Sequence, residues 1–96
     1  MILSFDIGIK NLAYCILDKH EDNKLSIIKW DIIKLLEDNE KCKGFPLNEI
    51  TKRMYTRLNN ELENYNITEI LLENQPCLKN PVMKSIQMII YGYFQY

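Results

Sequence analysis

The sequence is short of the features that mark membrane, secreted and disulfide-rich proteins. No uninterrupted apolar run among its 96 residues approaches the roughly 20 that a membrane span requires. The first residues lack the basic segment of a signal peptide and place an acid, Asp6, close to the start. The three cysteines form no Cys-x-x-Cys pair, which argues against a disulfide framework and a zinc knuckle. We therefore expect one globular domain, residues 1–96, that stays inside the cell, binds no membrane and keeps its thiols reduced.

Charge is nearly balanced, because 12 basic and 13 acidic side chains leave a net charge of −1 at pH 7. Bulk electrostatics alone therefore indicates neither a nucleic-acid nor an anionic-membrane partner. The distribution is uneven, since no acid follows Glu73 and residues 41–57 hold a single acid, Glu49. The basic residues of that stretch are Lys41, Lys43, Lys52, Arg53 and Arg57. Two interpretations stay open for it, a solvated surface or a phosphate-binding one.

The N-terminal residues predict a β-hairpin. Residues 2–7 alternate so that every second side chain is a large apolar one, with Asp6 on the other face near the end of the strand. Residues 8–11 form a tight turn in which Gly8 is free to adopt a positive φ. Residues 12–17 are an apolar run that would pair antiparallel with the first strand.

A third strand is predicted for residues 25–31, which are rich in β-branched and aromatic side chains. Trp30 of this strand is expected in the core rather than as a platform for base stacking. Together the three strands predict an antiparallel meander. Residues 32–45 leave two structures open, a longer strand or a short helix before a charged loop.

An amphipathic helix is predicted from Pro46, a residue that suits the first turn of a helix. Apolar side chains follow at steps of three and four residues, which places them on one helical face. They are Leu47, Ile50, Met54, Leu58, Leu62 and Tyr65. Residues 67–73 then predict a buried strand, which after a crossover helix should lie parallel to the first strand and beside it.

A second helix is predicted from about Val82 to the end of the sequence. One stripe carries no acid and consists of Asn80, Lys84, Gln87, Tyr91 and Gln95. The opposite side carries Val82, Ile86, Ile89 and Tyr93, flanked by Met83, Ile90 and Phe94. This apolar arc is wider than one sheet covers, so a partner subunit or further chain should contact it.

Two carboxylates, Asp6 and Glu73, stand at the ends of strands that we expect to be parallel neighbours. Both side chains should then emerge at the carboxyl edge of the sheet, where open α/β sheets place their ligands. Hard carboxylate oxygens suit Mg²⁺ or Mn²⁺, which need no histidine. Taken singly, each acid has a plain alternative as a turn or helix cap.

Two stretches of the sequence resemble a known nuclease family. Residues 3–13, LSFDIGIKNLA, resemble the first strand and turn of the RNase H-like nuclease superfamily, which includes the RuvC-type resolvases. Residues 71–91, LLENQPCLKNPVMKSIQMIIY, resemble the poxvirus-type Holliday junction resolvases of large DNA viruses. The implied fold is α/β and RNase H-like, with a three-stranded antiparallel meander, a parallel strand and flanking helices.

The resemblance implies a metal-dependent endonuclease that cuts four-way DNA junctions as a homodimer during viral recombination, in the cytoplasm of an infected cell. Asp6 and Glu73 match the first two metal-binding acids of the family, whose complete active site holds two Mg²⁺ or Mn²⁺ ions. The family carries two further acids on a helix that follows one more strand. By that pattern the chain corresponds to the N-terminal portion of a resolvase, incomplete at its C-terminal end, and we expect no cleavage by this portion alone.

Seven polar side chains are candidates for contact with DNA. Asn74 and Gln75 directly follow Glu73, so their amides can orient that acid or touch the backbone, or else bond their own turn. Lysines would meet phosphates, and polar residues of the final helix would follow the backbone. The set is Lys10, Asn74, Gln75, Lys79, Asn80, Lys84 and Gln87.

Two other functions stay open. The Asp6-x-Gly8 turn also occurs in actin-like kinases and chaperone ATPases, although no later Asp-x-Gly is present in this chain. The chain can alternatively be a noncatalytic module that binds DNA or dimerises.

Overall fold

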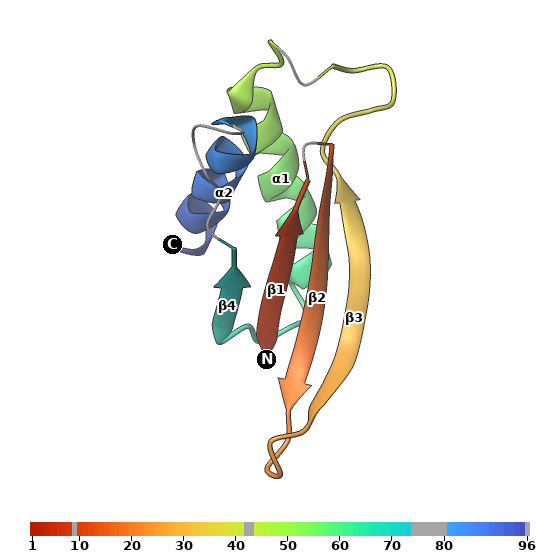
Figure 1. Ribbon diagram of the computed structural model, residues 1–96, viewed down its shortest axis with the longest axis vertical. Helices are drawn as coiled ribbons and strands as arrows, with labels where there is room; N and C mark the ends of the chain where they lie inside the picture. The colour runs from red at the N-terminus through yellow and green to blue at the C-terminus, as the bar shows by residue number, and fades with distance from the viewer. Residues whose placement is uncertain (9, 42–43, 74–80, 96) are drawn as a thin grey trace.

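The chain folds into a four-stranded sheet with two helices (Figure 1). The computed structural model describes residues 1–8, 10–41, 44–73 and 81–95. In chain order the elements are β1 (Ile2–Ile7), β2 (Asn11–Lys19), β3 (Leu25–Lys34), α1 (Leu47–Leu62), β4 (Glu69–Leu72) and α2 (Pro81–Phe94). The α/β class and the order of elements predicted from the sequence are confirmed. Neither helix in this part of the chain is long and apolar enough to cross a lipid bilayer.

The strands are arranged in the order β3-β2-β1-β4. β2 pairs antiparallel with both β1 and β3, which is the predicted meander, and β4 pairs parallel with β1. β1, β3 and β4 therefore run in one direction, as their arrowheads show in Figure 1. They end at a common side of the sheet, which we call the carboxyl edge.

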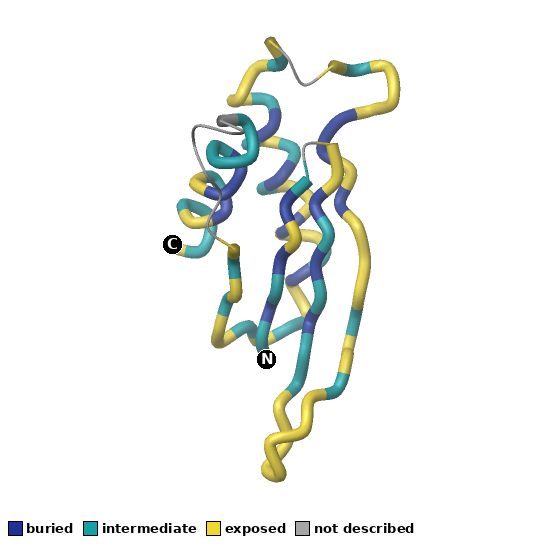
Figure 2. Tube along the Cα trace, viewed as in Figure 1, coloured by how far each residue is buried: buried dark blue, intermediate teal, exposed yellow. Residues whose placement is uncertain are grey.

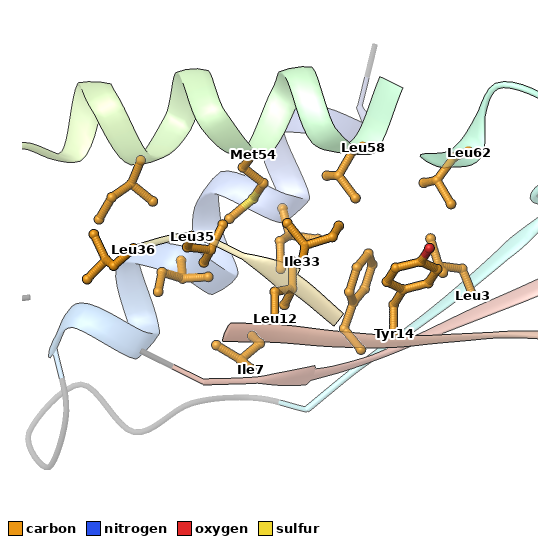
Figure 3. Close-up of a cluster of buried hydrophobic side chains, with 14 of the residues drawn as sticks. Leu3, Ile7, Leu12, Tyr14, Ile33, Leu35, Leu36, Met54, Leu58 and Leu62 are labelled. Atoms are coloured by element: carbon orange, nitrogen blue, oxygen red, sulfur yellow. The ribbon is translucent and has the colours of Figure 1, made fainter. Parts of the chain in front are cut away.

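Both helices pack on one face of the sheet, which we call the helix face. α1 contributes a buried residue at every fourth position, on the face that the sequence predicted, and Met54, Leu58 and Leu62 lie above the side chains of the sheet in Figure 3. The buried residues of α1 are Ile50, Met54, Leu58 and Leu62. The rings of Phe5 in β1 and Phe94 in α2 lie 6.0 Å apart, so α2 packs on the same face. The opposite side, the open face, carries no helix of the described chain.

The prediction that Trp30 lies in the core is wrong, because its side chain is 73% exposed on the open face. The side chains of β3 that point to the helix face are those of Lys29, Asp31 and Ile33, and only Ile33 is buried. Ile27 and Ile32 lie on the open face with Trp30, and each is 60% exposed. Figure 2 shows the resulting strand, exposed along most of its length. The open face is therefore an apolar surface.

The segment that the sequence left open, residues 32–45, is strand as far as Lys34 and irregular over residues 35–41 and 44–45. Leu35 and Leu36 are fully buried, and their N–H groups donate to the carbonyl of Lys10 at 2.7 and 3.2 Å. Arg53 of α1 holds the loop that follows, with bonds of 2.7 and 2.9 Å to the carboxylate of Glu40. The hydrogen bonds from this guanidinium lower the pKa of Glu40 to about 2.

Candidate active site

Asp6 lies at the carboxyl edge, on the open face of β1. Its neighbours Phe5 and Ile7 are each only 5% exposed on the helix face, so strand alternation turns Asp6 the other way, where it is exposed. Its partner on β2 is Ala13, whose side chain is small. The carboxylate is therefore accessible from solvent.

Glu73 follows β4 directly, at the same edge. The parallel register pairs Ser4 with Leu71 and Phe5 with Leu72, so Asp6 is the next residue of β1 and Glu73 is the first residue after β4. Residues in register on neighbouring strands point to the same face, and such strands lie about 4.8 Å apart. Continued by one residue, this register would bring the two acids side by side at the carboxyl edge. Glu73 is exposed and has a polar interaction of its own.

A shallow cavity of about 240 Å³ opens beside Asp6 on the open face. Its lining consists of Ser4, Phe5, Asp6, Ala13, Tyr14, Cys15, Ile27 and Trp30. Cys15 is a free cysteine in this cavity, whereas Cys42 and Cys77 lie outside the described residues. Sequence reasoning did not assign Ser4, Cys15 or Trp30 to the site. The available signal was the alternation of side chains along a strand, because Ser4 lies two residues before Asp6 and so shares its face. Ser4 pairs with Cys15 on β2, and Cys15 pairs with Trp30 on β3.

The turn after Asp6 requires glycine at position 8 for a different reason from the one predicted. Gly8 does not adopt a positive φ, and the glycine that does is Gly44. A Cβ at position 8 would lie 2.5 Å from the carbonyl oxygen of Asn11, which is backbone and cannot rotate away. Close approach of two backbone segments therefore excludes a side chain here.

The whole chain, residues 1–96, matches the family described as poxvirus A22 protein. The chain belongs to this family. The resemblance to poxvirus-type, RuvC-like resolvases that the sequence suggested is thereby confirmed. The family match favours this resemblance over the actin-like alternative.

Relatives of the A22-family chain agree with this placement. The mitochondrial cruciform cutting endonuclease 1 of Schizosaccharomyces pombe is 31% identical over 81 residues, which take in 77% of this chain and 30% of the relative. The yeast mitochondrial Holliday junction resolvase Ydc2 superposes with a TM-score of 0.71 and 25% identity, covering 98% of this chain and 43% of that one.

The fold is shared more widely. T. thermophilus RuvC in complex with a Holliday junction substrate gives a TM-score of 0.65 at 16% identity, over 98% of this chain and 59% of that one. The fold is therefore RuvC-like, and the RNase H-like prediction is confirmed. The chain spans under two thirds of the length of each of these three proteins.

The predicted DNA-contacting residues of the A22-family chain are only partly placed. Lys10 is exposed at the carboxyl edge, next to the turn that follows Asp6. Lys84 is half-buried on α2 and has a polar interaction. The remaining loop candidates Asn74, Gln75, Lys79 and Asn80 lie outside the described residues.

Gln87 is a correction, because it does not lie on the surface that the helical stripe predicted. Its side chain is 1% exposed and lies between Ile86 and Ile90, which are fully buried. The inward side of α2 is rotated from the predicted one, since Ile89 is only partly buried. A buried amide in this position cannot reach a DNA backbone.

The two carboxylates are of the type that binds Mg²⁺ or Mn²⁺, but they form only part of a complete ligand set. The described residues hold no group of three or more histidine, cysteine or acidic side chains that could bind a metal ion together. Mg²⁺ is commonly held by one or two carboxylates, with water and substrate phosphates as its other ligands. Asp6, near the end of β1, and Glu73, directly after β4, are the candidates for that minimum of hard oxygen ligands.

A polar network fixes α1 to the sheet below the site. Glu61 accepts hydrogen bonds from the hydroxyl of Tyr14 at 2.7 Å and from the Lys29 ammonium at 2.6 Å. Burial and then the bond to Glu61 raise the pKa of Tyr14 to about 12, and the same carboxylate raises the pKa of Lys29. The two donors lower the pKa of Glu61 in return.

This network predicts a loss of stability in alkali. A group whose pKa is raised by folding stabilises fully below its unfolded pKa, and that contribution is lost as the pH rises through the folded value. The free energy of unfolding should therefore fall between pH 10 and 12, the ordinary and the raised pKa of Tyr14, by about 2 kcal/mol. Urea titrations across this range measure it. Glu61→Gln should flatten the decline in part, because burial, the larger cause of the raised pKa of Tyr14, remains in the variant. An equally steep decline would contradict a contribution from the bond to Glu61.

Proposed function

We propose that this chain carries two metal-binding acids of a structure-specific endonuclease that resolves four-way DNA junctions. The observation that supports the proposal is the β1–β4 register, which ends at Phe5 and Leu72, one residue before Asp6 and Glu73. The names of the relatives supply the substrate class, since one is a cruciform cutting endonuclease and another a Holliday junction resolvase.

Asp6 and Glu73 are proposed to hold Mg²⁺ or Mn²⁺, with two ions in a complete active site. When bound, such ions activate water and stabilise the leaving oxygen of a phosphodiester. Asp6 is fixed by its strand, and Gly8 keeps the turn after it narrow. Exposure of both acids leaves room for the DNA backbone to approach the edge. By the resemblance, the family uses two further acids, so Asp6 and Glu73 are proposed as part of the ligand set.

The proposed partner is branched duplex DNA, bound by a homodimer with one site for each arm. The proposed location is the cytoplasm of an infected cell, in keeping with the viral family that the chain belongs to. Shape recognition of a junction depends on backbone contacts and deformability more than on base edges.

A second candidate is a noncatalytic junction-binding module. It is favoured by the finding that, within the part of the chain that is described, no three histidine, cysteine or acidic side chains lie close enough to hold a metal ion together. This candidate shares the DNA partner and lacks the cleavage step.

Gel-shift titration with a labelled four-way junction and a linear duplex of the same sequence tests the proposal. In Ca²⁺, we expect the chain to bind the junction at least about tenfold more tightly than the linear duplex, because the affinity for a specific site exceeds the affinity for nonspecific DNA by large factors. Equal affinity for the two substrates would contradict it. In Mg²⁺, any cutting that disappears in Asp6→Asn supports an endonuclease acting alone, and binding without cutting supports the module.

A further inference from the structure

A basic cleft lies between α1 and the end of β3, away from the acid pair. It encloses about 360 Å³ and is lined by Lys34, Glu37, Lys52, Arg53, Thr56 and Arg57. The sequence brought three of these cations together on a helix, and the fold adds Lys34 from the sheet. Four cations and one carboxylate thus surround the same space.

Two of the four cations are committed to carboxylates of the chain. Arg53 binds Glu40 through two hydrogen bonds and lies 3.5 Å from Glu49, and it also donates to the carbonyl of Leu35 at 3.0 Å. Lys34 lies 3.1 Å from the carboxylate of Asp38. These pairs build the wall of the cleft and leave little charge for a ligand.

Lys52 and Arg57 are the two cations that remain available. Both are exposed, and neither forms an ion pair with the chain as far as it is described. The carboxylate that acts on Arg57 from a distance is Glu61, which already accepts hydrogen bonds from two other side chains. A lysine and an arginine that line one cleft offer a point charge and a planar fork, the pair of donors that phosphate groups select.

The cleft opens at the same edge as the acids. Lys34 is the last residue of β3, which runs parallel to β1 with only β2 between them. Two strand spacings separate β3 from β1 by about 10 Å. Asp6 lies on the open face and α1 on the helix face, so an arm that contacts both would pass over the carboxyl edge, with a phosphate on each strand every 3.4 Å or so along its axis.

We infer that Lys52 and Arg57 form a second DNA-contacting site, which binds backbone phosphates of a junction arm beyond the cleavage edge. The inference rests on the proposed function for the identity of its ligand. The site holds and orients an arm without touching the reacting phosphodiester. Its contribution is electrostatic, so it depends on salt and not on base sequence.

The test is the salt dependence of junction binding by the full chain. Fluorescence anisotropy of a labelled four-way junction, in Ca²⁺ and over a series of NaCl concentrations, gives the slope of log Kd against log salt. The variant Lys52→Gln with Arg57→Gln should reduce that slope by about 1.8, or about 0.9 for each phosphate that the variant no longer neutralises. The matched control is Lys19→Gln with Lys24→Gln, which removes the same charge from the opposite end of the sheet.

The outcomes separate the two proposals. A smaller slope in the cleft variant and an unchanged one in the control supports the site. Equal slopes for cleft variant and control, with tight junction binding retained, would overturn the site and leave the proposed function standing. Cleft-dependent binding with equal affinity for junction and linear duplex supports the site and overturns junction selectivity. A wild-type chain that binds no DNA would overturn both.

Discussion

Replacing Asp6 with asparagine is expected to lower the affinity of the chain for Mn²⁺ at least about tenfold. The substitution keeps the size and shape of the side chain and removes one of two charges that would attract the ion. Because Asp6 is exposed on the open face, the core beneath it should be unaffected. Isothermal titration calorimetry with Mn²⁺ measures the change directly.

A matched carboxylate elsewhere on the sheet provides the control for this experiment. Asp18 lies near the far end of β2, paired with Ser26 and remote from the carboxyl edge. Asp18→Asn should bind Mn²⁺ as the wild type does. An equal loss in Asp6→Asn and Asp18→Asn would show that binding reflects overall charge and would contradict a site at Asp6.

The largest effect on stability is expected from Leu12→Ala. Leu12 is fully buried, and it pairs with Ile7 on one side and Ile33 on the other, at the edge that carries the site. Truncating such a side chain leaves a cavity and should lower the free energy of unfolding by about 3–5 kcal/mol. That is a large part of the roughly 5–15 kcal/mol by which domains of this kind are stable.

Leu25→Ala is the matched control for Leu12→Ala, because it removes the same atoms from a leucine that is 56% exposed in β3. Its cost should stay within about 0.5–1 kcal/mol. Urea unfolding followed by circular dichroism compares the two variants. Similar losses at both positions would mean that the core does not lie where the structure places it.

Periodicity was sufficient to predict most elements, because each buries one face. The helical stripe from Ile50 to Leu62 and the alternation of residues 2–7 are such patterns, and both are confirmed. Trp30 could not be placed this way, since β3 exposes apolar side chains on the open face and turns Lys29 inward to meet Glu61 on α1. That contact joins residues far apart in the sequence, so local pattern carries no sign of it.

The candidate site was predictable to the extent that it depends on strand ends. Asp6 and Glu73 follow from the expected parallel pairing, whereas Cys15 and Trp30 enter the cavity only through the cross-strand register. Gln87 was misplaced because a polar residue on an apolar helix was taken to mark its outer face. Lys34 joins the basic cleft through the fold alone, as the sequence gives no indication that the end of β3 meets α1.

Terbium luminescence tests most directly whether the two acids share an ion. Tb³⁺ occupies hard oxygen sites, and Trp30, the single tryptophan, lines the same cavity as Asp6 and can sensitise it. We predict sensitised Tb³⁺ emission from the wild-type chain, which decreases when Mg²⁺ or Mn²⁺ displaces the Tb³⁺. Asp6→Asn and Glu73→Gln should each abolish this emission. Glu21→Gln, in the distant turn, should retain it. Full emission in either of the first two variants would contradict a shared cation.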